Sequence, residues 1–170
     1  GDNTDGDGLV RDITERHRLD LRARRVLVLG AGGAAQAILP ALLDAGVDTI
    51  TISNRNPERA DALGDFIGEP ARVRTAYWDQ LADAGQFDLV INATSAGVQG
   101  KALDLPFSIL TPRSLAYDLS YGPAASLFLS WARAGEAWRA IDGFGMLVEQ
   151  AALAFAGWFG QSPDTEPVYL

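Results

Sequence analysis

Residues 25–35 read RVLVLGAGGAA, an apolar run that ends on glycines and leads into a helical pattern reaching Leu43. This order is typical of the first βα unit of a dinucleotide-binding fold. Glycines allow a tight turn and let backbone N–H groups approach phosphate oxygens, and the helix N-terminus adds unpaired donors. Gly30, Gly32 and Ala35 lie between a strand-like and a helix-like segment, which is the context that the motif requires. We predict that a dinucleotide binds here; the alternative is a glycine turn that only joins two core elements.

The size and charge of the chain restrict the classes of protein that it can belong to. Its 170 residues, 48% of them hydrophobic, are enough for one well-cored domain and too few for two of ordinary size. A net charge of −8 and a pI near 4.5 argue against nucleic acid or an anionic membrane as a partner. The absence of cysteine and the single histidine, His17, exclude disulfides, thiolate catalysis and cysteine or multi-histidine metal sites.

Two features of the sequence concern its context in the cell. It contains no apolar run of the about 18 residues that a membrane span requires and no signal peptide, so we expect a cytoplasmic protein. It opens on Gly1 rather than methionine, which suggests a piece of something longer.

The N-terminal segment is polar. Residues 1–8 predict a turn that leads into a helix capped by Thr4 or Asp5, with His17 further along as a solvated side chain. Asp5 therefore has two interpretations, an acidic helix start or a functional carboxylate at the edge of a site.

Short strand-like and helix-like segments alternate through the rest of the chain. Strands are predicted at 49–53, 72–77, 87–92, 114–119 and 137–141, and helices after Pro57, at 79–84, at 124–134 and up to about Trp158. In the helix after the glycine loop, the predicted buried face consists of Ala34, Ala37, Ile38, Ala41, Leu42 and Ala45, and Pro40 interrupts the pattern. This alternation predicts an α/β, doubly wound parallel sheet. Ligands of such sheets bind beyond the carboxyl ends of the strands, so the small and polar residues there should line one crevice.

The second predicted strand ends on residues that favour NADP over NAD. An NAD-preferring fold places an acidic residue there, against the ribose 2′-OH. This chain has Asn54 and Arg55, with Arg59 in the first turn of the next helix, where Asn56 and Pro57 form the cap and first turn. Cations at a helix N-terminus are unfavourable without an anion, and arginine forks match phosphate oxygens. A 2′-phosphate would supply that anion, although exposed loop arginines without a ligand are also common.

Motifs along nearly the whole chain resemble the C-terminal NADP-binding domain of the shikimate dehydrogenase family. They are Asn3–Gly6, Gly30–Ala34, Asn54-Arg55, Ile91–Thr94, Tyr117-Asp118, Asp142-Gly143, Gly145–Val148, Gln150–Ala152, Pro163-Asp164 and Glu166–Val168. The resemblance implies a Rossmann-type domain at 21–170 with a C-terminal helix, preceded by a linker helix at 1–20. It also implies reversible NADPH-dependent reduction of 3-dehydroshikimate to shikimate, in aromatic amino-acid biosynthesis.

The resemblance also implies roles for individual residues. Asp5 is implied as the catalytic residue, one half of a lysine–aspartate pair that holds the reacting group and passes its proton. Substrate contacts are implied from Asp5, Tyr121 and Gln150. Cofactor contacts are implied from Gly30, Ala31, Gly32, Gly33, Ala34, Asn54, Arg55, Asn56, Arg59, Thr94, Leu119 and Gly143.

The chain departs from the family pattern at several positions. The family's N-terminal substrate domain, with its catalytic lysine, is absent from this sequence, and Lys101 lies in the wrong segment, an exposed and mobile loop, to replace that lysine. Asn56 replaces a usual threonine, and Ser120 a usually bulkier residue. We predict that the isolated chain binds NADP but is nearly inactive. The alternatives are a quinate/shikimate dehydrogenase relative and a non-catalytic NADP-binding module.

Overall fold

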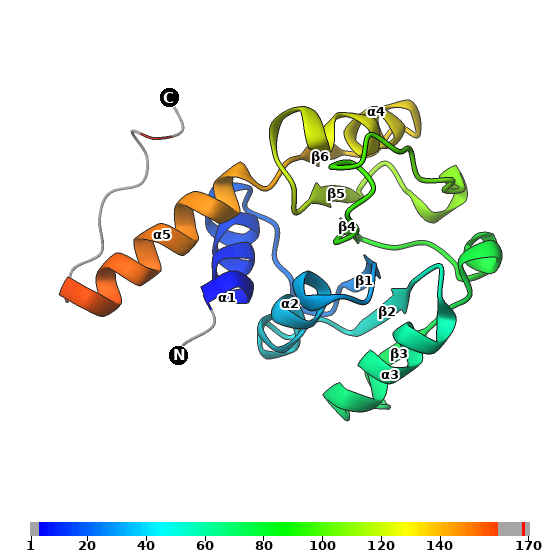
Figure 1. Cartoon of the computed structure of the whole chain (residues 1–170), viewed down its shortest axis with the longest axis horizontal. Helices are drawn as coiled ribbons and strands as arrows, with labels where there is room; N and C mark the ends of the chain where they lie inside the picture. The colour runs from blue at the N-terminus through cyan, green and yellow to red at the C-terminus, as the bar shows by residue number, and fades with distance from the viewer. Residues whose placement is uncertain (1–3, 160–167, 169–170) are drawn as a thin grey trace.

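The computed structural model describes residues 4–159 and 168, and shows one six-stranded parallel sheet in the order β3-β2-β1-β4-β5-β6 (Figure 1). The strands are β1 (Arg25–Leu29), β2 (Thr49–Ser53), β3 (Val73–Thr75), β4 (Leu89–Asn92), β5 (Leu115–Asp118) and β6 (Arg139–Ile141). The strand order reverses beside β1, as in a doubly wound Rossmann-type sheet. The predicted fold class is therefore confirmed. Asn3 and most of the C-terminal motif at 163–168 lie outside the described residues.

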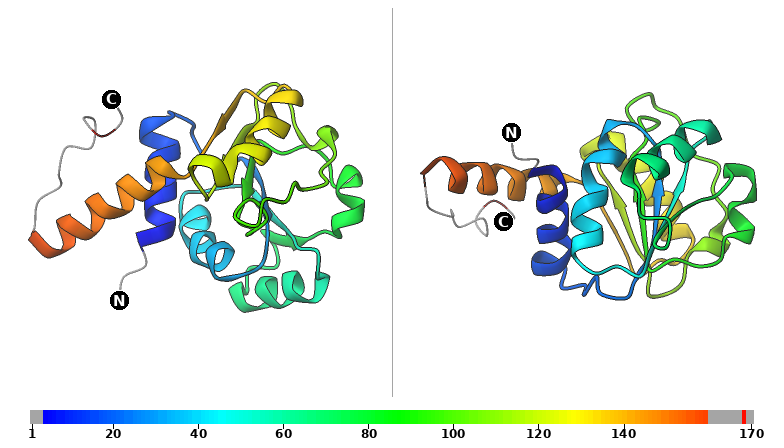
Figure 2. Two further views of the ribbon diagram at one scale, coloured as in Figure 1. Left: turned by 45° about the horizontal axis from the view of Figure 1, so that its top comes forward. Right: turned by 90° about the horizontal axis from the view of Figure 1, so that it is seen from below.

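Helices cover both faces of the sheet, and α1 and α5 lie together at one side of it (Figures 1 and 2). The α-helices are α1 (Thr4–Arg11), α2 (Gly33–Asp44), α3 (Pro57–Ile67), α4 (Ser126–Ala134) and α5 (Phe144–Phe159), and the short helical turns are η1 (Asp12–Arg16), η2 (Trp78–Asp83), η3 (Phe107–Ile109) and η4 (Gly122–Ala125). The helix α5 starts beside α1 and extends away from the body of the molecule. None of the helices among the described residues is long and apolar enough to span a membrane.

The strand β1 divides its side chains between two cores, as a strand buried on both faces must. Val26 and Val28 belong to the core that α1, α2 and α3 cover, whereas Leu27 and Leu29 belong to the core that α4, η2 and η3 cover. All four side chains are fully buried. Burial on both faces explains why residues 26–29 form a continuous apolar run without alternation.

The helix predicted with a cap at Thr4 or Asp5 is present as α1, which begins at Thr4, so the polar segment is not a turn as far as residue 8. Its glycines are contact points between helices rather than turn residues. A Cβ on Gly6 would lie 2.8 Å from the Cβ of Ala41 in α2, and one on Gly8 would lie 3.0 Å from the Cγ of Gln150 in α5. The helix α1 is therefore wedged between α2 and α5, and only glycine permits that approach.

The predicted buried face of α2 is rotated relative to the observed one. The side chains in the core are those of Ala35, Ile38, Leu39, Leu42 and Leu43, whereas Ala34 is exposed. Ala37 and Ala41 instead meet α1 at Gly6. Pro40 lies inside the helix as predicted, on its exposed side, where it cannot donate the usual backbone hydrogen bond.

Candidate functional site

The segments that follow the strands are joined to one another at the carboxyl edge of the sheet. The backbone N–H of Gly30 donates to the carbonyl of Ser53 at 2.8 Å, and that of Ala93 donates to Leu29 at 2.8 Å. Further along the edge, Leu119 N–H donates to the carbonyl of Asn92 at 3.0 Å. Each of these loops therefore leaves the sheet from a fixed starting point, as a preorganised binding edge requires.

The glycine loop combines one close contact with open space. Gly30 has φ +108°, and a Cβ there would lie 2.9 Å from the carbonyl oxygen of Ala93, so both its backbone conformation and its surroundings require glycine. By contrast, a Cβ on Gly32 or Gly33 would meet nothing within 4 Å. These two residues are the N-cap and first residue of α2, where backbone N–H groups are free to bind an anion. The loop therefore fits a dinucleotide pyrophosphate.

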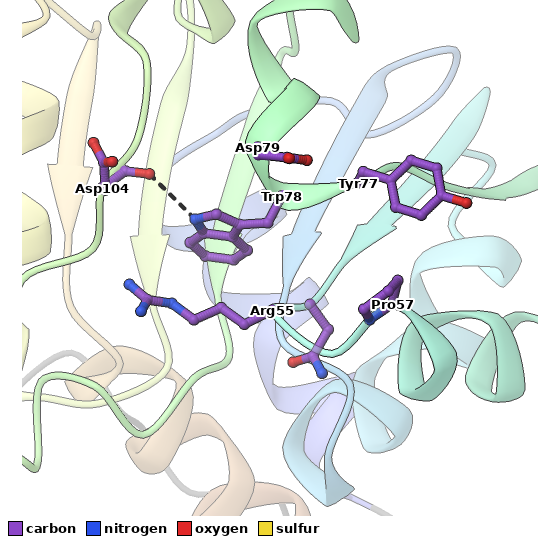
Figure 3. A pocket seen from close by; sticks show the side chains of 7 residues that line it. Arg55, Pro57, Tyr77, Trp78, Asp79 and Asp104 are labelled. Carbon is purple, nitrogen blue, oxygen red and sulfur yellow. Dashed lines mark hydrogen bonds between the residues drawn. The ribbon is translucent and has the colours of Figure 1, made fainter.

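The end of β2 presents Arg55 on a fixed turn. The side chain of Asn56 accepts a hydrogen bond from the backbone N–H of Glu58 at 3.1 Å, and Pro57 is the first residue of α3, which confirms the predicted cap. The Arg55 guanidinium lies 5.5 Å from the ring centroid of Trp78, and the Trp78 indole N–H donates to the carbonyl of Asp104 at 3.2 Å (Figure 3). This cation–π contact holds the Arg55 guanidinium over the Trp78 ring.

Two hollows open on either side of this Arg55–Trp78 contact, and Asn54, Arg55 and Trp78 line both. The first, of about 480 Å³, is completed by Pro57, Tyr77, Asp79 and Asp104. The second, of about 490 Å³, reaches the segment after β4 and is completed by Thr94, Ser95, Ala96, Gln99, Lys101, Ala102 and Leu103. The predicted residues Asn54, Arg55 and Thr94 are therefore brought together in the second hollow.

The two arginines predicted to act together line different hollows. Arg59 lies with Ala31, Gln36 and Phe66 around a separate hollow of about 270 Å³ beside α3. Both guanidinium groups belong to exposed residues at the start of α3. The shared contact of Arg55 and Arg59 with one phosphate stays a prediction.

A buried amide–carboxylate pair fixes the loops that follow β4 and β5. Asn92 Nδ2 donates to Asp118 Oδ2 at 3.0 Å, while Asn92 Oδ1 accepts from the Thr94 hydroxyl at 2.7 Å. Asp118 Oδ1 accepts from the backbone N–H of Ser120 at 2.8 Å. Burial raises the pKa of the Asp118 carboxyl above its usual value, against these hydrogen bonds. The pair positions Thr94 and Leu119 without itself facing the hollows.

The loop after β6 meets the loop after β5 at Gly143. A Cβ there would lie 2.3 Å from the carbonyl oxygen of Leu119, and the Gly143 N–H donates to Ser120 at 2.8 Å. The two predicted cofactor residues Leu119 and Gly143 are therefore in direct contact, just before α5. Tyr121 lies two residues beyond Leu119 and is 54% exposed.

The predicted substrate residues Asp5 and Gln150 are also in contact. Gln150 Nε2 of α5 donates to Asp5 Oδ1 of α1, across 145 residues of sequence. Gln150 lies two turns into α5, about 10 Å along the helix from Gly143. The structure therefore brings together two predicted substrate residues from opposite ends of the chain.

A buried carboxylate that no sequence motif indicated, Asp12, lies beneath this region. Its Oδ2 accepts a hydrogen bond from the Tyr117 hydroxyl of β5 at 2.6 Å, and a Cβ on Gly145 of α5 would lie 2.2 Å from its Oδ1. Burial raises the pKa of Asp12 to about 6, the Tyr117 hydrogen bond lowers it, and the nearby Glu149 raises it. Asp12 thus connects η1, β5 and α5 behind the site.

The prediction that His17 is solvated is wrong. Its side chain is only 19% exposed, and its Nε2 lies 3.7 Å from Asp12 Oδ1. Burial, followed by the charges of Arg139 and Arg16, lowers the pKa of His17 to about 4. Because Asp12 is protonated before His17 as the pH falls, the two groups do not form an ion pair.

Comparison with known proteins assigns the chain to a family. The family model described as shikimate / quinate 5-dehydrogenase matches residues 11–99, more than half of the chain. The chain belongs to the shikimate / quinate 5-dehydrogenase family. A second model, the shikimate 5′-dehydrogenase C-terminal domain, matches residues 143–169 of this family member.

Relatives of known name and structure agree with this family. The shikimate dehydrogenase (NADP(+)) of Xylella fastidiosa strain M12 is 58% identical, over 99% of this chain and 61% of that protein. The crystal structure of an Ael1 enzyme from Pseudomonas putida is 45% identical with a TM-score of 0.89, over 97% of this chain and 60% of that one. A shikimate 5-dehydrogenase from Thermus thermophilus, in complex with NADP(H) and shikimate, is 33% identical with a TM-score of 0.78, over 96% and 59%. The chain thus spans about three-fifths of the length of these relatives.

Proposed function

We propose that the chain is the cofactor-binding part of an NADP-dependent shikimate dehydrogenase, which reduces 3-dehydroshikimate to shikimate. The observation that carries this proposal is the hydrogen bond between Asp5 and Gln150, at one side of a nucleotide-binding edge. A domain that only senses NADP has no use for a carboxylate–amide pair at that place. The names of the relatives support the same reaction.

The described residues fit a bound NADP. The open space above Gly32 and Gly33 accommodates the pyrophosphate on the N-terminus of α2. Asn54 and Arg55 receive the adenosine ribose and its 2′-phosphate, and Leu119 and Gly143 lie at the nicotinamide end. When bound, NADPH supplies the hydride that reduces the substrate.

Asp5 is the proton-handling residue in this proposal. Gln150 orients its carboxylate through the hydrogen bond, and the carboxylate holds the reacting hydroxyl or carbonyl of the substrate. The family resemblance implies a lysine partner for Asp5 from an N-terminal substrate domain. The helix α5 also exposes Leu147, Phe155 and Trp158, apolar side chains that such a domain could cover.

Cofactor preference is tested by calorimetric titration of the 170-residue chain with NADPH and, separately, with NADH. We expect tighter binding of NADPH, and Arg55→Ala should reduce that preference about tenfold or more, because a charge-assisted contact to phosphate is lost. Arg113→Ala is the matched control, since it removes the same charge before β5, at the opposite edge of the sheet. Equal binding of the two cofactors, unchanged by Arg55→Ala, would contradict the assignment to NADP.

Turnover tests the other half of the proposal. We expect the isolated chain to oxidise shikimate negligibly and a protein extended to the length of the relatives to do so readily. Asp5→Asn in the extended protein should lower kcat strongly while NADPH binding is retained. Robust turnover by the isolated chain would show that its own residues complete the site.

Quinate is the alternative substrate, because the family model covers shikimate and quinate dehydrogenases alike. Ser120, half-buried between Leu119 and Tyr121, stands where the family usually has a bulkier residue. A panel of shikimate and quinate on the extended protein separates the two activities by their kcat/KM values.

A further inference from the structure

We propose that Asp142 is a positioning residue for hydride transfer, whose carboxylate holds the segment after β5, with Tyr121, in a fixed place relative to the start of α5. This inference rests on the proposed function, which assigns Leu119 and Gly143 to the nicotinamide end and Tyr121 to the substrate. The Asp142-Gly143 motif indicates the family but assigns no role to the carboxylate. The hydrogen bonds of Asp142 supply that role.

The first argument is that the two oxygens of Asp142 bind two different segments. Its Oδ2 accepts a hydrogen bond from the backbone N–H of Gly122 at 3.2 Å, across 20 residues of sequence. Its Oδ1 accepts one from the backbone N–H of Phe144 at 3.1 Å. Gly122 begins η4 and Phe144 begins α5, so both donors are N–H groups that a helical element leaves without a partner of its own. One carboxylate therefore joins the starts of two elements.

The second argument is that this carboxylate completes the backbone hydrogen bonds around Tyr121. Before Tyr121, the carbonyl of Ser120 accepts a hydrogen bond from the N–H of Gly143 at 2.8 Å. After Tyr121, the N–H of Gly122 donates to Asp142. Gly122 has φ +64° and, as a glycine, can adopt many other conformations, so the bond to Asp142 selects this one. Because Tyr121 is 54% exposed, packing alone does not fix it, and Asp142 holds its second side.

The third argument is what α5 carries. Its start lies against the proposed nicotinamide end, because a Cβ on Gly143 would lie 2.3 Å from the carbonyl oxygen of Leu119. The same helix carries Gln150, a predicted substrate residue. By binding both segments, Asp142 sets the places of Tyr121 and Gln150 relative to each other and to the nicotinamide end. Hydride transfer is sensitive to such placement, since a displacement of about 1 Å can cost about a hundredfold in rate.

Nucleotide binding by the 170-residue chain tests whether Asp142 acts on the nicotinamide end. NADP and adenosine 2′,5′-bisphosphate share the adenosine half, and only NADP carries the nicotinamide. We expect Asp142→Asn to weaken NADP about fivefold and the bisphosphate less than about twofold, because an amide offers one acceptor oxygen to two N–H donors. Asp142→Ala, which removes both acceptors, should weaken NADP about tenfold and the bisphosphate again less than about twofold.

Asp88→Ala is the matched control for these variants. The half-buried Asp88 also joins two segments, because its Oδ2 accepts a hydrogen bond from the backbone N–H of Arg25 at 2.9 Å. It precedes β4, at the opposite edge of the sheet from the proposed site. We expect a loss of stability like that of Asp142→Ala in urea denaturation, with unchanged binding of both nucleotides.

Turnover by the protein extended to the length of the relatives gives a readout that a loss of stability alone does not move. We expect Asp142→Asn to lower kcat for shikimate about tenfold or more. Shikimate deuterated at the carbon that is oxidised should then show a larger isotope effect on kcat, because a displaced nicotinamide slows the hydride step rather than product release. Asp88→Ala should retain both the kcat and the isotope effect of the wild type.

The outcomes separate this inference from the proposed function. If Asp142→Asn weakens NADP and the bisphosphate equally, or weakens neither, Asp142 does not position the nicotinamide end and the inference is overturned. An unchanged kcat and isotope effect in an active extended protein would overturn it as well. If NADP alone is weakened but the extended wild type does not oxidise shikimate, the role of Asp142 toward the nicotinamide stands and the proposed reaction fails. If the wild-type chain binds neither nucleotide, both proposals fail together.

Discussion

The cofactor edge and the seam between α1 and α5 use glycine in opposite ways. At the cofactor edge, a Cβ on Gly32 or Gly33 would meet nothing within 4 Å, so these glycines keep space open for a ligand. In the seam, a Cβ on Gly8 or Gly145 would lie 3.0 Å or less from another side chain or backbone atom, so these glycines allow helices to touch. The comparison teaches that one residue type can mark either a binding site or a packing contact. Only the surroundings distinguish the two.

The largest effect should come from filling the seam. Gly145→Ala places a Cβ 2.2 Å from Asp12 Oδ1 and should displace the carboxylate from Tyr117. We expect a loss of about 4 kcal/mol in the free energy of unfolding, from overpacking and a buried charge left without its partner. Gly157→Ala in the same helix meets nothing within 4 Å and should be neutral or slightly stabilising. Urea denaturation measures both, and equal effects would remove the distinction between the two regions.

The next effect concerns the pH dependence of the seam. The pKa of Asp12 is raised from 3.8 to about 6. Its contribution to the free energy of unfolding is therefore present below pH 3.8 and is lost as the pH rises through 6. The amount lost is about 3 kcal/mol. The pKa of His17 is lowered from 6.5 to about 4, so its contribution is present above pH 6.5 and is lost as the pH falls through 4. Between pH 4 and 6.5 the two contributions oppose each other.

Variants should separate these two contributions. Asp12→Asn should make the chain lose stability more steeply than the wild type on acidification from pH 6.5 to 4, because only the His17 contribution remains. His17→Asn should make it gain stability over the same range. Thermal unfolding across this range measures both slopes, and parallel curves for the three proteins would show that neither group titrates as inferred.

A smaller effect is expected at the cofactor edge. Gly32→Ala should leave the free energy of unfolding within about 0.5 kcal/mol of the wild type, because its Cβ meets no protein atom. The same Cβ should occupy space needed by the pyrophosphate and weaken both NADPH and NADH about tenfold. Calorimetric titration beside urea denaturation checks the two halves. A loss of stability without a loss of binding would reverse the roles assigned to the edge and the seam.

The smallest effect should be that of the Asp5–Gln150 hydrogen bond on folding. Gln150→Ala removes the donor to a half-buried carboxylate and should cost about 1 kcal/mol of stability. NADPH binding by the chain should not change, since neither residue is among those proposed to contact the cofactor. Weakened NADPH binding would instead connect the seam to the cofactor edge.

Most of the strands, the glycine loop and the helix cap at Asn56 could be predicted from the sequence, because each depends on local periodicity or on neighbouring residues. The contacts of α1 could not. Its acidic and glycine-rich sequence is typical of a turn, and nothing in it indicates that Gly6 and Gly8 allow contacts with α2 and α5. The same limit applies to α2, whose core face depends on which side the sheet occupies.

The candidate site divides in the same way. Arg55 and Thr94 follow strands, so their convergence in one hollow could be predicted from the topology of a parallel sheet. The contacts of Trp78 and Asp12 could not, because each is made with atoms brought together from distant segments. The expectation of a solvated His17 fails for the same reason. The polar sequence around His17 does not indicate that the fold brings Asp12 and Arg139 close to its imidazole ring.

The separation of 145 residues between Asp5 and Gln150 has a consequence for the order in which the molecule assembles. The glycine loop forms from consecutive residues, so closing it costs little chain entropy, whereas α1 meets α5 only after nearly the whole chain has been ordered. We therefore expect the contact of α1 with α5 to form late and to open first in hydrogen exchange. A partly unfolded chain would then keep its glycine loop, the proposed pyrophosphate site, after Asp5 and Gln150 had separated.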